Sequence, residues 1–134
     1  MSQSRPGVAR KPRVRRTVLV VEDEVLIRMD VAEALRLAGL RVIEASSADE
    51  ALRLLDQGHE VDVIFSDINM PGELDGLDLH KVATVRFPNV KLILTSARPL
   101  PEGAPTRGIR FIAKPYPIQT VLRAIEDEPG TDDA

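Results

Sequence analysis

The 134-residue chain contains no cysteine. It therefore has no disulfide framework, no thiolate metal site and no cysteine nucleophile. It also lacks an apolar run near the roughly 20 residues that cross a bilayer, and its N-terminus lacks the apolar stretch and cleavage site of a secretory signal. These absences predict a cytoplasmic protein, free of membranes, whose chemistry uses oxygen and nitrogen groups.

Two common catalytic motifs are also missing. The sequence contains neither a Gly-rich phosphate loop of the GxxxxGK type nor a GxSxG nucleophile elbow. Nucleotide hydrolysis and acyl transfer therefore lack their usual apparatus. The two histidines, His59 and His80, show no metal-ligand spacing to each other or to other donors, and both are expected on the surface.

Charge is distributed unevenly along the chain. Residues 1–16 carry six of the 18 basic residues and no acid, which leaves 12 basic against 21 acidic residues, or −9, in the remainder. An acidic body of this kind is a poor general binder of nucleic acid. We expect a disordered basic arm over 1–16, one folded domain over 17–127 and a flexible acidic tail over 128–134, with no separate DNA-binding domain.

Within the folded unit, short apolar runs alternate with segments of helical spacing. Strands are expected at 17–21, 41–45, 61–66, 90–94 and 110–113, and helices near 27–38, 48–55, 79–86 and 118–125. Ser47 and Glu50 predict a capping box, Gly39 suits a left-handed helix end, and Pro117 suits the first position of the last helix. The alternation implies a doubly wound α/β fold, with helices on both faces of a parallel sheet.

One connection departs from this alternation. Between Thr95 and Lys114, the segment ARPLPEGAPTRGIRFIA contains three prolines and no helical stripe. Proline removes a backbone donor and breaks the interior of a helix. The helix between the fourth and fifth strands is therefore predicted to be short or missing.

Polar side chains follow the ends of four of the expected strands. In chain order they are Glu22, Asp23, Glu24, Asp67, Asn69, Thr95, Ser96 and Lys114. Doubly wound folds place their sites at the carboxyl ends of the strands, so these side chains should converge. Clustered carboxylates favour a hard divalent cation, which predicts Mg²⁺ and phosphoryl transfer with Asp67 as the nucleophile. Glu24 is expected to be a helix N-terminal acid rather than a metal ligand, and a direct role for Ser96 stays open.

Four stretches that occur in order at these strand ends are VLVVEDE, FSDINMPGELDGLDL, LTSA and KPY. Together they resemble the receiver domain of bacterial two-component response regulators, over about Thr17 to Ile125. The resemblance implies a stand-alone receiver domain with a flavodoxin-like five-stranded sheet of order 2-1-3-4-5. The loop MPGELDG after Asp67 is one residue longer than the commonest form in the family, MPxMDG.

The resemblance also implies a role for each acidic position. Asp67 matches the phosphoacceptor, and Asp23 matches the acid that binds Mg²⁺ directly. Glu22 matches the acid that acts largely through a metal-bound water. Asn69 occupies the position whose backbone carbonyl completes the metal shell.

Further roles are implied at the last two strands. Thr95 matches the hydroxyl that engages the phosphoryl group, and Lys114 matches the ammonium that pairs with the phosphorylated aspartate. The bond between Lys114 and Pro115 is expected to be cis. Phe111 matches the switch aromatic of the family, although a simple core role is also open.

A receiver domain of this kind takes its phosphoryl group from a histidine kinase or a histidine phosphotransfer protein, and signals to a downstream protein by contact. It catalyses only its own phosphorylation and slow self-dephosphorylation, so it is not an enzyme.

The usual dimer of the family is in doubt because the fourth helix contributes to it, and a homodimer stays open. Two alternatives are a degenerate receiver that binds partners without phosphorylation, and a Mg²⁺-dependent phosphatase of the haloacid dehalogenase kind. The second needs a DxD motif, whereas Asp67-Ile68-Asn69 lacks the second carboxylate.

Overall fold

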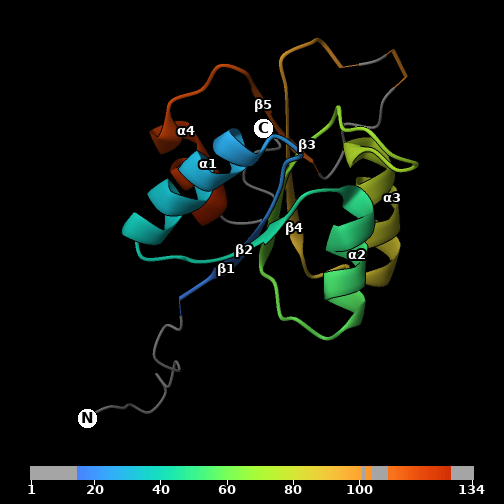
Figure 1. Cartoon of the computed structure of the whole chain (residues 1–134), viewed down its shortest axis with the longest axis horizontal. Helices are drawn as coiled ribbons and strands as arrows, with labels where there is room; N and C mark the ends of the chain where they lie inside the picture. The colour runs from blue at the N-terminus through green and yellow to red at the C-terminus, as the bar shows by residue number, and fades with distance from the viewer. Residues whose placement is uncertain (1–14, 101, 104–108, 128–134) are drawn as a thin grey trace.

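Five strands and four helices alternate along the part of the chain that the computed structural model describes, residues 15–100, 102–103 and 109–127 (Figure 1). In chain order they are β1 Thr17–Val21, α1 Val25–Leu37, β2 Arg41–Ala45, α2 Ala48–Asp56, β3 Val63–Asp67, α3 Gly76–Arg86, β4 Lys91–Ser96, β5 Arg110–Ala113 and α4 Ile118–Glu126. The predicted elements are all present, with some of their ends moved by a few residues.

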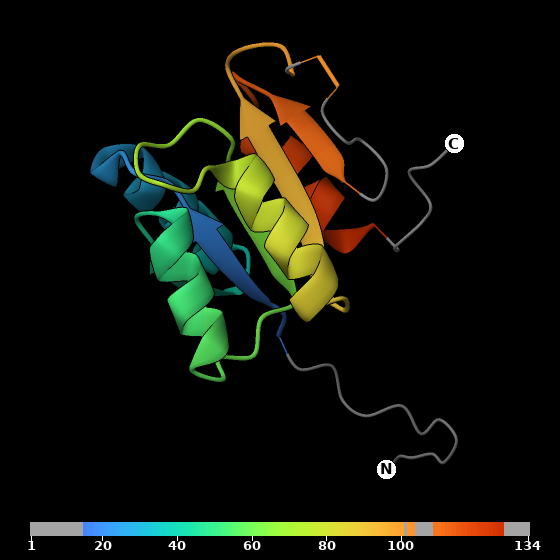
Figure 2. The same ribbon diagram turned by 90° about the vertical axis from the view of Figure 1, so that its right-hand side faces the viewer.

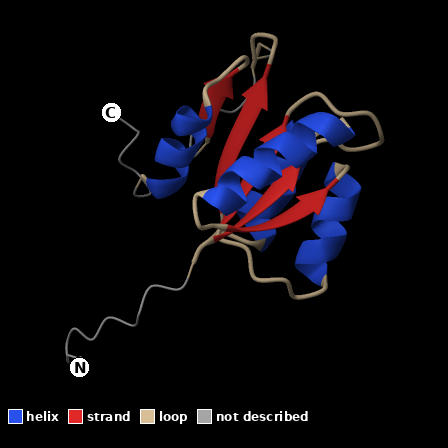
Figure 3. Ribbon diagram, turned by 60° about the vertical axis from the view of Figure 1, so that its left-hand side comes forward, coloured by secondary structure: helices blue, strands red, loops and turns tan. Residues whose placement is uncertain are grey.

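All five strands are parallel, in the order β2-β1-β3-β4-β5. This confirms the predicted doubly wound sheet. Helices α1 and α4 cover one face, and α2 and α3 cover the other, as the views in Figures 2 and 3 show. The strand order reverses at β1 and β3, which is where folds of this type place their functional sites.

Each face of the sheet has its own hydrophobic core, because successive strand residues point to opposite sides. Val18 and Val20 pack with α1 and α4, whereas Leu19 and Val21 pack with α2 and α3. All four side chains are almost completely buried. This two-sided burial explains why β1 and β3 occur in the sequence as continuous apolar runs rather than alternating ones.

The helix ends confirm the sequence predictions in part. Gly39 has the expected positive φ of 96°, and the Ser47 side chain accepts a hydrogen bond from the Glu50 backbone N–H at 3.0 Å. The Glu50 carboxylate, however, accepts from the backbone N–H and hydroxyl of Ser46 rather than from Ser47, and these bonds lower its pKa. Pro117 is the N-cap of α4, not its first residue, so that prediction was wrong by one position.

A complete capping box occurs instead at the start of α3. Asp75 accepts from the Asp78 backbone N–H at 2.9 Å, and Asp78 accepts from the Asp75 N–H at 3.0 Å. With this cap, α3 begins at Gly76, three residues before the predicted Leu79. The earlier start places the first turn of α3 beside the end of β3.

Between β4 and β5, the described residues 97–100, 102–103 and 109 contain no helix. This agrees with the predicted short or missing helix, and residues 101 and 104–108 lie outside the described residues. Most of the predicted basic arm, residues 1–14, and the whole of the predicted acidic tail also lie outside them. In the described part of the chain, no helix has the length and apolar character needed to cross a membrane.

The prediction that both histidines lie on the surface was wrong for His80. Its side chain is on α3 and only 7% exposed, with Nδ1 3.2 Å from the Thr84 hydroxyl, while His59 is exposed as expected. Burial, and to a smaller extent the charge of Lys81, lowers the pKa of His80 from its ordinary 6.5. The His80 imidazole is therefore harder to protonate in the folded protein than in the unfolded chain.

Stability should consequently depend on pH through His80. The unfolded chain binds this proton more readily, so the free energy of unfolding should decrease as pH falls below about 6.5 toward the lower folded-state pKa. We expect the free energy of unfolding, measured with urea, to decrease less between about pH 7.5 and about pH 5.5 in His80→Gln than in wild type. His59→Gln should show the same decrease as wild type. The same decrease in wild type and His80→Gln would show that other groups cause it.

Candidate functional site

The carboxyl ends of β1, β3 and β5 bring three predicted residues into direct contact. Lys114 Nζ lies 2.7 Å from Asp67 Oδ2 and 3.6 Å from Glu22 Oε1. Asp67 and Glu22 are 7% and 6% exposed, so both carboxylates are held largely away from water. An ammonium group placed between two buried carboxylates offsets their mutual repulsion.

Burial and neighbouring charges shift the pKa values of Glu22 and Lys114. Burial raises the pKa of Glu22, with the negative charges of Asp67 and Asp23 adding to the effect and Lys114 opposing it. Burial also disfavours the charged form of Lys114, but its hydrogen bond and attraction to Asp67 outweigh this, and the pKa of Lys114 is raised. Lys114 is therefore a permanent cation at the site at neutral pH.

Asp67 is positioned by the loop that follows β3. Its second carboxylate oxygen, Oδ1, accepts a hydrogen bond from the Asn69 backbone N–H at 3.0 Å. The Gly76 N–H, in the first turn of α3, donates to the Ile68 carbonyl at 3.0 Å. The start of α3 thus fixes the backbone that carries Asp67.

Thr95 lies beside Asp67 on the neighbouring strand, where the two residues are Cα partners in the β3–β4 register. Its side chain is 2% exposed, and within the described residues its hydroxyl oxygen is the buried side-chain atom that has no hydrogen-bond partner. Buried polar groups are nearly always paired. A hydroxyl that is buried, unpaired and next to a carboxylate suggests a ligand oxygen as its missing partner.

The donor set suits Mg²⁺. Asp67 and Glu22 are buried at the strand ends, Asp23 is half-buried next to Glu22, and Asn69 is exposed on the loop. Among the described residues, no group of three or more His, Cys, Asp or Glu side chains encloses a ready cation site. Mg²⁺ does not need one, since it usually keeps several waters and takes one or two carboxylates.

Two further residues support the site: Arg28, which sequence analysis did not consider, and Ser96, whose direct role it left open. Arg28 on α1 donates from Nη1 to the Glu22 carbonyl at 2.9 Å and from Nε to the Glu44 carboxylate at 3.2 Å. Ser96 accepts from the Asn69 side-chain amide at 3.0 Å. The bonds of Arg28 to Glu44 and of Asn69 to Ser96 join residues 16 and 27 positions apart, and no local pattern signals them. Glu24 is exposed at the N-cap of α1, as expected of a helix N-terminal acid.

Arg28 should stabilise the loop that carries Glu22. Its side chain is only 16% exposed, so Arg28→Ala takes this donor from the Glu22 carbonyl and leaves Arg36 as the remaining partner of the Glu44 carboxylate. We expect the free energy of unfolding in urea to fall by about 1–2 kcal/mol. Arg36→Ala is the matched control, because Arg36 pairs with the same Glu44 but is 50% exposed, and it should cost less than about 1 kcal/mol. Equal losses in the two variants would contradict a special role for Arg28.

Phe111 is half-buried on β5, beside Leu94 of β4 and on the opposite face from the buried Ile112. Tyr116 is partly buried and packs against the core, where it meets the buried Phe65 edge to face with ring centres 5.7 Å apart. The predicted cis peptide between Lys114 and Pro115 is present. The switch role of Phe111 stays a prediction.

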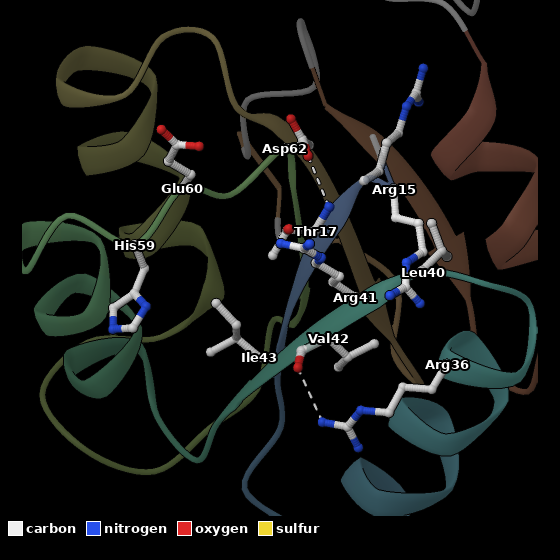
Figure 4. Close-up of a pocket in the computed structure, with 11 residues that line it drawn as sticks. Arg15, Thr17, Arg36, Leu40, Arg41, Val42, Ile43, His59, Glu60 and Asp62 are labelled. Atoms are coloured by element: carbon white, nitrogen blue, oxygen red, sulfur yellow. Dashed lines mark hydrogen bonds between the residues drawn. The ribbon is translucent and has the colours of Figure 1, made fainter. Parts of the chain in front are cut away.

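A pocket of about 980 Å³ lies at the opposite end of the sheet from this cluster (Figure 4). It surrounds the start of β1 and β2 and is lined by side chains of mixed charge, among them Arg15, Arg41, Glu60 and Asp62. None of the predicted site residues lines it. The candidate site is therefore the charged strand-end cluster and not this pocket.

A doubly wound sheet with an acidic pair, a central aspartate, a hydroxyl and a lysine at its strand ends defines the class of phosphoacceptor receiver domains. A family model of the response regulator receiver domain matches residues 18–126. The transcriptional regulatory protein PdtaR of Mycobacterium tuberculosis is 40% identical over 117 residues, which cover 84% of this chain and 56% of that protein. The chemotaxis protein CheY1 of Helicobacter pylori is 32% identical over 127 residues, covering 87% of this chain and 98% of that protein.

Solved structures agree with these sequence matches. The response regulator TrrA of Thermotoga maritima, in complex with Mg²⁺ and BeF, superposes with a TM-score of 0.70 at 26% identity and covers 82% of this chain and 96% of that one. The chain belongs to the response regulator receiver domain family. It spans about half the length of its relative PdtaR, at 56%.

Proposed function

We propose that Asp67 accepts a phosphoryl group from a phosphohistidine on a histidine kinase or a histidine phosphotransfer protein. The observation that carries the proposal is the arrangement around Asp67, with Lys114 Nζ at 2.7 Å and the unpaired Thr95 hydroxyl on the adjacent strand. Proteins that transfer phosphoryl groups mainly position the reactants and neutralise their charge. The Asp67 carboxylate is the nucleophile, the Lys114 ammonium neutralises charge, and the unpaired Thr95 hydroxyl can position the phosphoryl group.

In the transfer, a carboxylate oxygen of Asp67 bonds to phosphorus as the bond from phosphorus to the donor imidazole nitrogen breaks, and the bonding electron pair stays on that nitrogen. The Lys114 ammonium balances the negative charge that arrives with the phosphoryl oxygens. The Thr95 hydroxyl donates a hydrogen bond to one of these oxygens. The Asn69 N–H, already 3.0 Å from Asp67 Oδ1, holds the carboxylate in place during the step.

We also propose that the site uses Mg²⁺. Asp23 and Asp67 would hold the ion through their carboxylates and Asn69 through its backbone carbonyl, with Glu22 in an indirect role. When bound, the ion neutralises charge on the phosphoryl oxygens. Thr95 and Lys114 would not coordinate the metal ion in this arrangement and would stay available to bind the phosphoryl group.

Phosphorylation would then act as a conformational signal. A phosphoryl group drawn to Thr95 and Lys114 would move the loop after β4 inward and allow the half-buried Phe111 to change rotamer. The output would be contact with a partner protein, or onward transfer of the phosphoryl group. A haloacid dehalogenase type of phosphatase is disfavoured because Asn69 stands where that chemistry needs a second carboxylate.

The decisive test is intact-mass analysis after incubation with Mg²⁺ and acetyl phosphate. We expect a labile gain of about 80 Da, the mass of one phosphoryl group, which is absent when EDTA removes the metal. No gain with acetyl phosphate, other small donors or a panel of histidine kinases would favour the degenerate receiver, which binds partners without phosphorylation.

A further inference from the structure

Ser96, the last residue of β4, links three parts of the site through hydrogen bonds. Its hydroxyl accepts from the Asn69 side-chain amide and from the Arg98 backbone N–H, each at 3.0 Å. Its carbonyl accepts from the Lys114 backbone N–H at 2.9 Å. The side chain is 2% exposed. One buried serine therefore connects the loop after β3, the loop after β4 and the backbone of the phosphate-binding lysine.

The bond to Ser96 fixes the orientation of the Asn69 carboxamide. The amide nitrogen points to Ser96, and the carboxamide oxygen on the other side of the same planar group is left for solvent, since Asn69 is exposed. The backbone of Asn69 is itself bound to Asp67 Oδ1. An oriented acceptor for water thus lies next to the residue that receives the phosphoryl group.

We infer that Ser96 is a positioning residue that sets the lifetime of the phosphoryl group on Asp67, an inference that rests on the proposed function. Held by Ser96, the Asn69 carboxamide oxygen accepts a hydrogen bond from the water that hydrolyses the acyl phosphate. The water oxygen bonds to phosphorus, the bond between phosphorus and the Asp67 oxygen breaks, and the products are inorganic phosphate, the free carboxylate and a proton released to solvent. Ser96 touches none of the reacting atoms and acts through Asn69.

The test is the decay of the phosphorylated protein after removal of acetyl phosphate, followed by intact mass in Mg²⁺ buffer. Ser96→Ala should lengthen the half-life about fivefold, the effect of one lost hydrogen bond of ordinary strength. Asn69→Ala, which keeps the backbone carbonyl, should lengthen it at least as much. If Ser96 acts through the Asn69 carboxamide and not through its second bond to the Arg98 N–H, the double variant should match Asn69→Ala alone.

Ser47→Ala is the matched control, since Ser47 also accepts a backbone N–H at 3.0 Å but caps α2 and bonds to Glu50, which is not a residue of the site. It should lower stability and leave the half-life unchanged. Titration calorimetry should give the same Mg²⁺ affinity for Ser96→Ala as for wild type. An unchanged or shorter half-life in Ser96→Ala, additive effects in the double variant, or a lost Mg²⁺ affinity would each overturn the inference. A wild-type protein that takes up no phosphoryl group would instead overturn the proposed function itself.

Discussion

Asp67→Asn is expected to abolish the mass gain of about 80 Da from acetyl phosphate completely. The substitution removes the nucleophilic carboxylate but keeps its size. The single acceptor oxygen of asparagine can still pair with the Asn69 N–H, which lies 3.0 Å from Oδ1, while the Lys114 ammonium, 2.7 Å from Oδ2, loses this acceptor and keeps Glu22 at 3.6 Å. Loss of phosphorylation would then follow from lost chemistry and not from a collapsed site.

Asp49→Asn supplies the control for this experiment. Asp49 is an exposed acid in the first turn of α2, and its removal should leave the mass gain intact. Circular dichroism of both variants should show native helix content. A gain that persists in Asp67→Asn would place the phosphoryl group on another residue, which peptide mapping under conditions that preserve acyl phosphates would locate.

Gly76→Ala is expected to cost about 2–3 kcal/mol of stability and to impair phosphorylation. A Cβ at this position would overlap the carbonyl oxygen of Asp67 and lie 2.7 Å from Ile68 Cα. Both are backbone atoms, which cannot move aside as the end of a flexible side chain can. The first turn of α3 would have to shift, and the loop holding Asp67 and Asn69 would shift with it.

Gly39→Ala is the control that distinguishes the steric overlap at Gly76 from the backbone strain of an alanine at positive φ. Gly39 has a φ of +96° but no atom within 4 Å of its would-be Cβ, so alanine there should cost about 1–2 kcal/mol through backbone strain alone. Urea unfolding and the rate of phosphorylation by acetyl phosphate should be measured for both variants. If Gly76→Ala phosphorylates as fast as Gly39→Ala, the contact at Gly76 does not control the geometry of Asp67.

The sequence was sufficient to predict the sheet and which polar residues of the candidate site come together at its edge. Continuous apolar runs such as β1 and β3 indicate strands buried on both faces, and the helical spacing between them indicates crossovers. Because parallel strands all end at the same edge, polar residues at strand ends had to converge. The structure confirms that convergence for Glu22, Asp67, Thr95 and Lys114.

Boundaries and caps were less predictable because competing local partners decide them. Glu50 had two donors in reach and bonded to Ser46 rather than Ser47. The Asp75–Asp78 box moved the start of α3 to Gly76, although the apolar stripe begins at Leu79. Such choices depend on the path of the incoming loop, which the residue types alone do not fix.

By itself, the sequence determined the alternation of strands and helices, the edge at which the site forms and the chemical groups present there, since each depends on residues near one another in the chain. Only the tertiary structure decided that His80 is buried and that Arg28 donates a hydrogen bond to the Glu22 carbonyl. It also decided that Gly76 lies close to the backbone of Asp67 and that the Asn69 amide bonds to Ser96. These contacts join segments brought together by packing of helices and strands. Such packing depends on the shapes of both partners at once, and no periodicity along one segment encodes it.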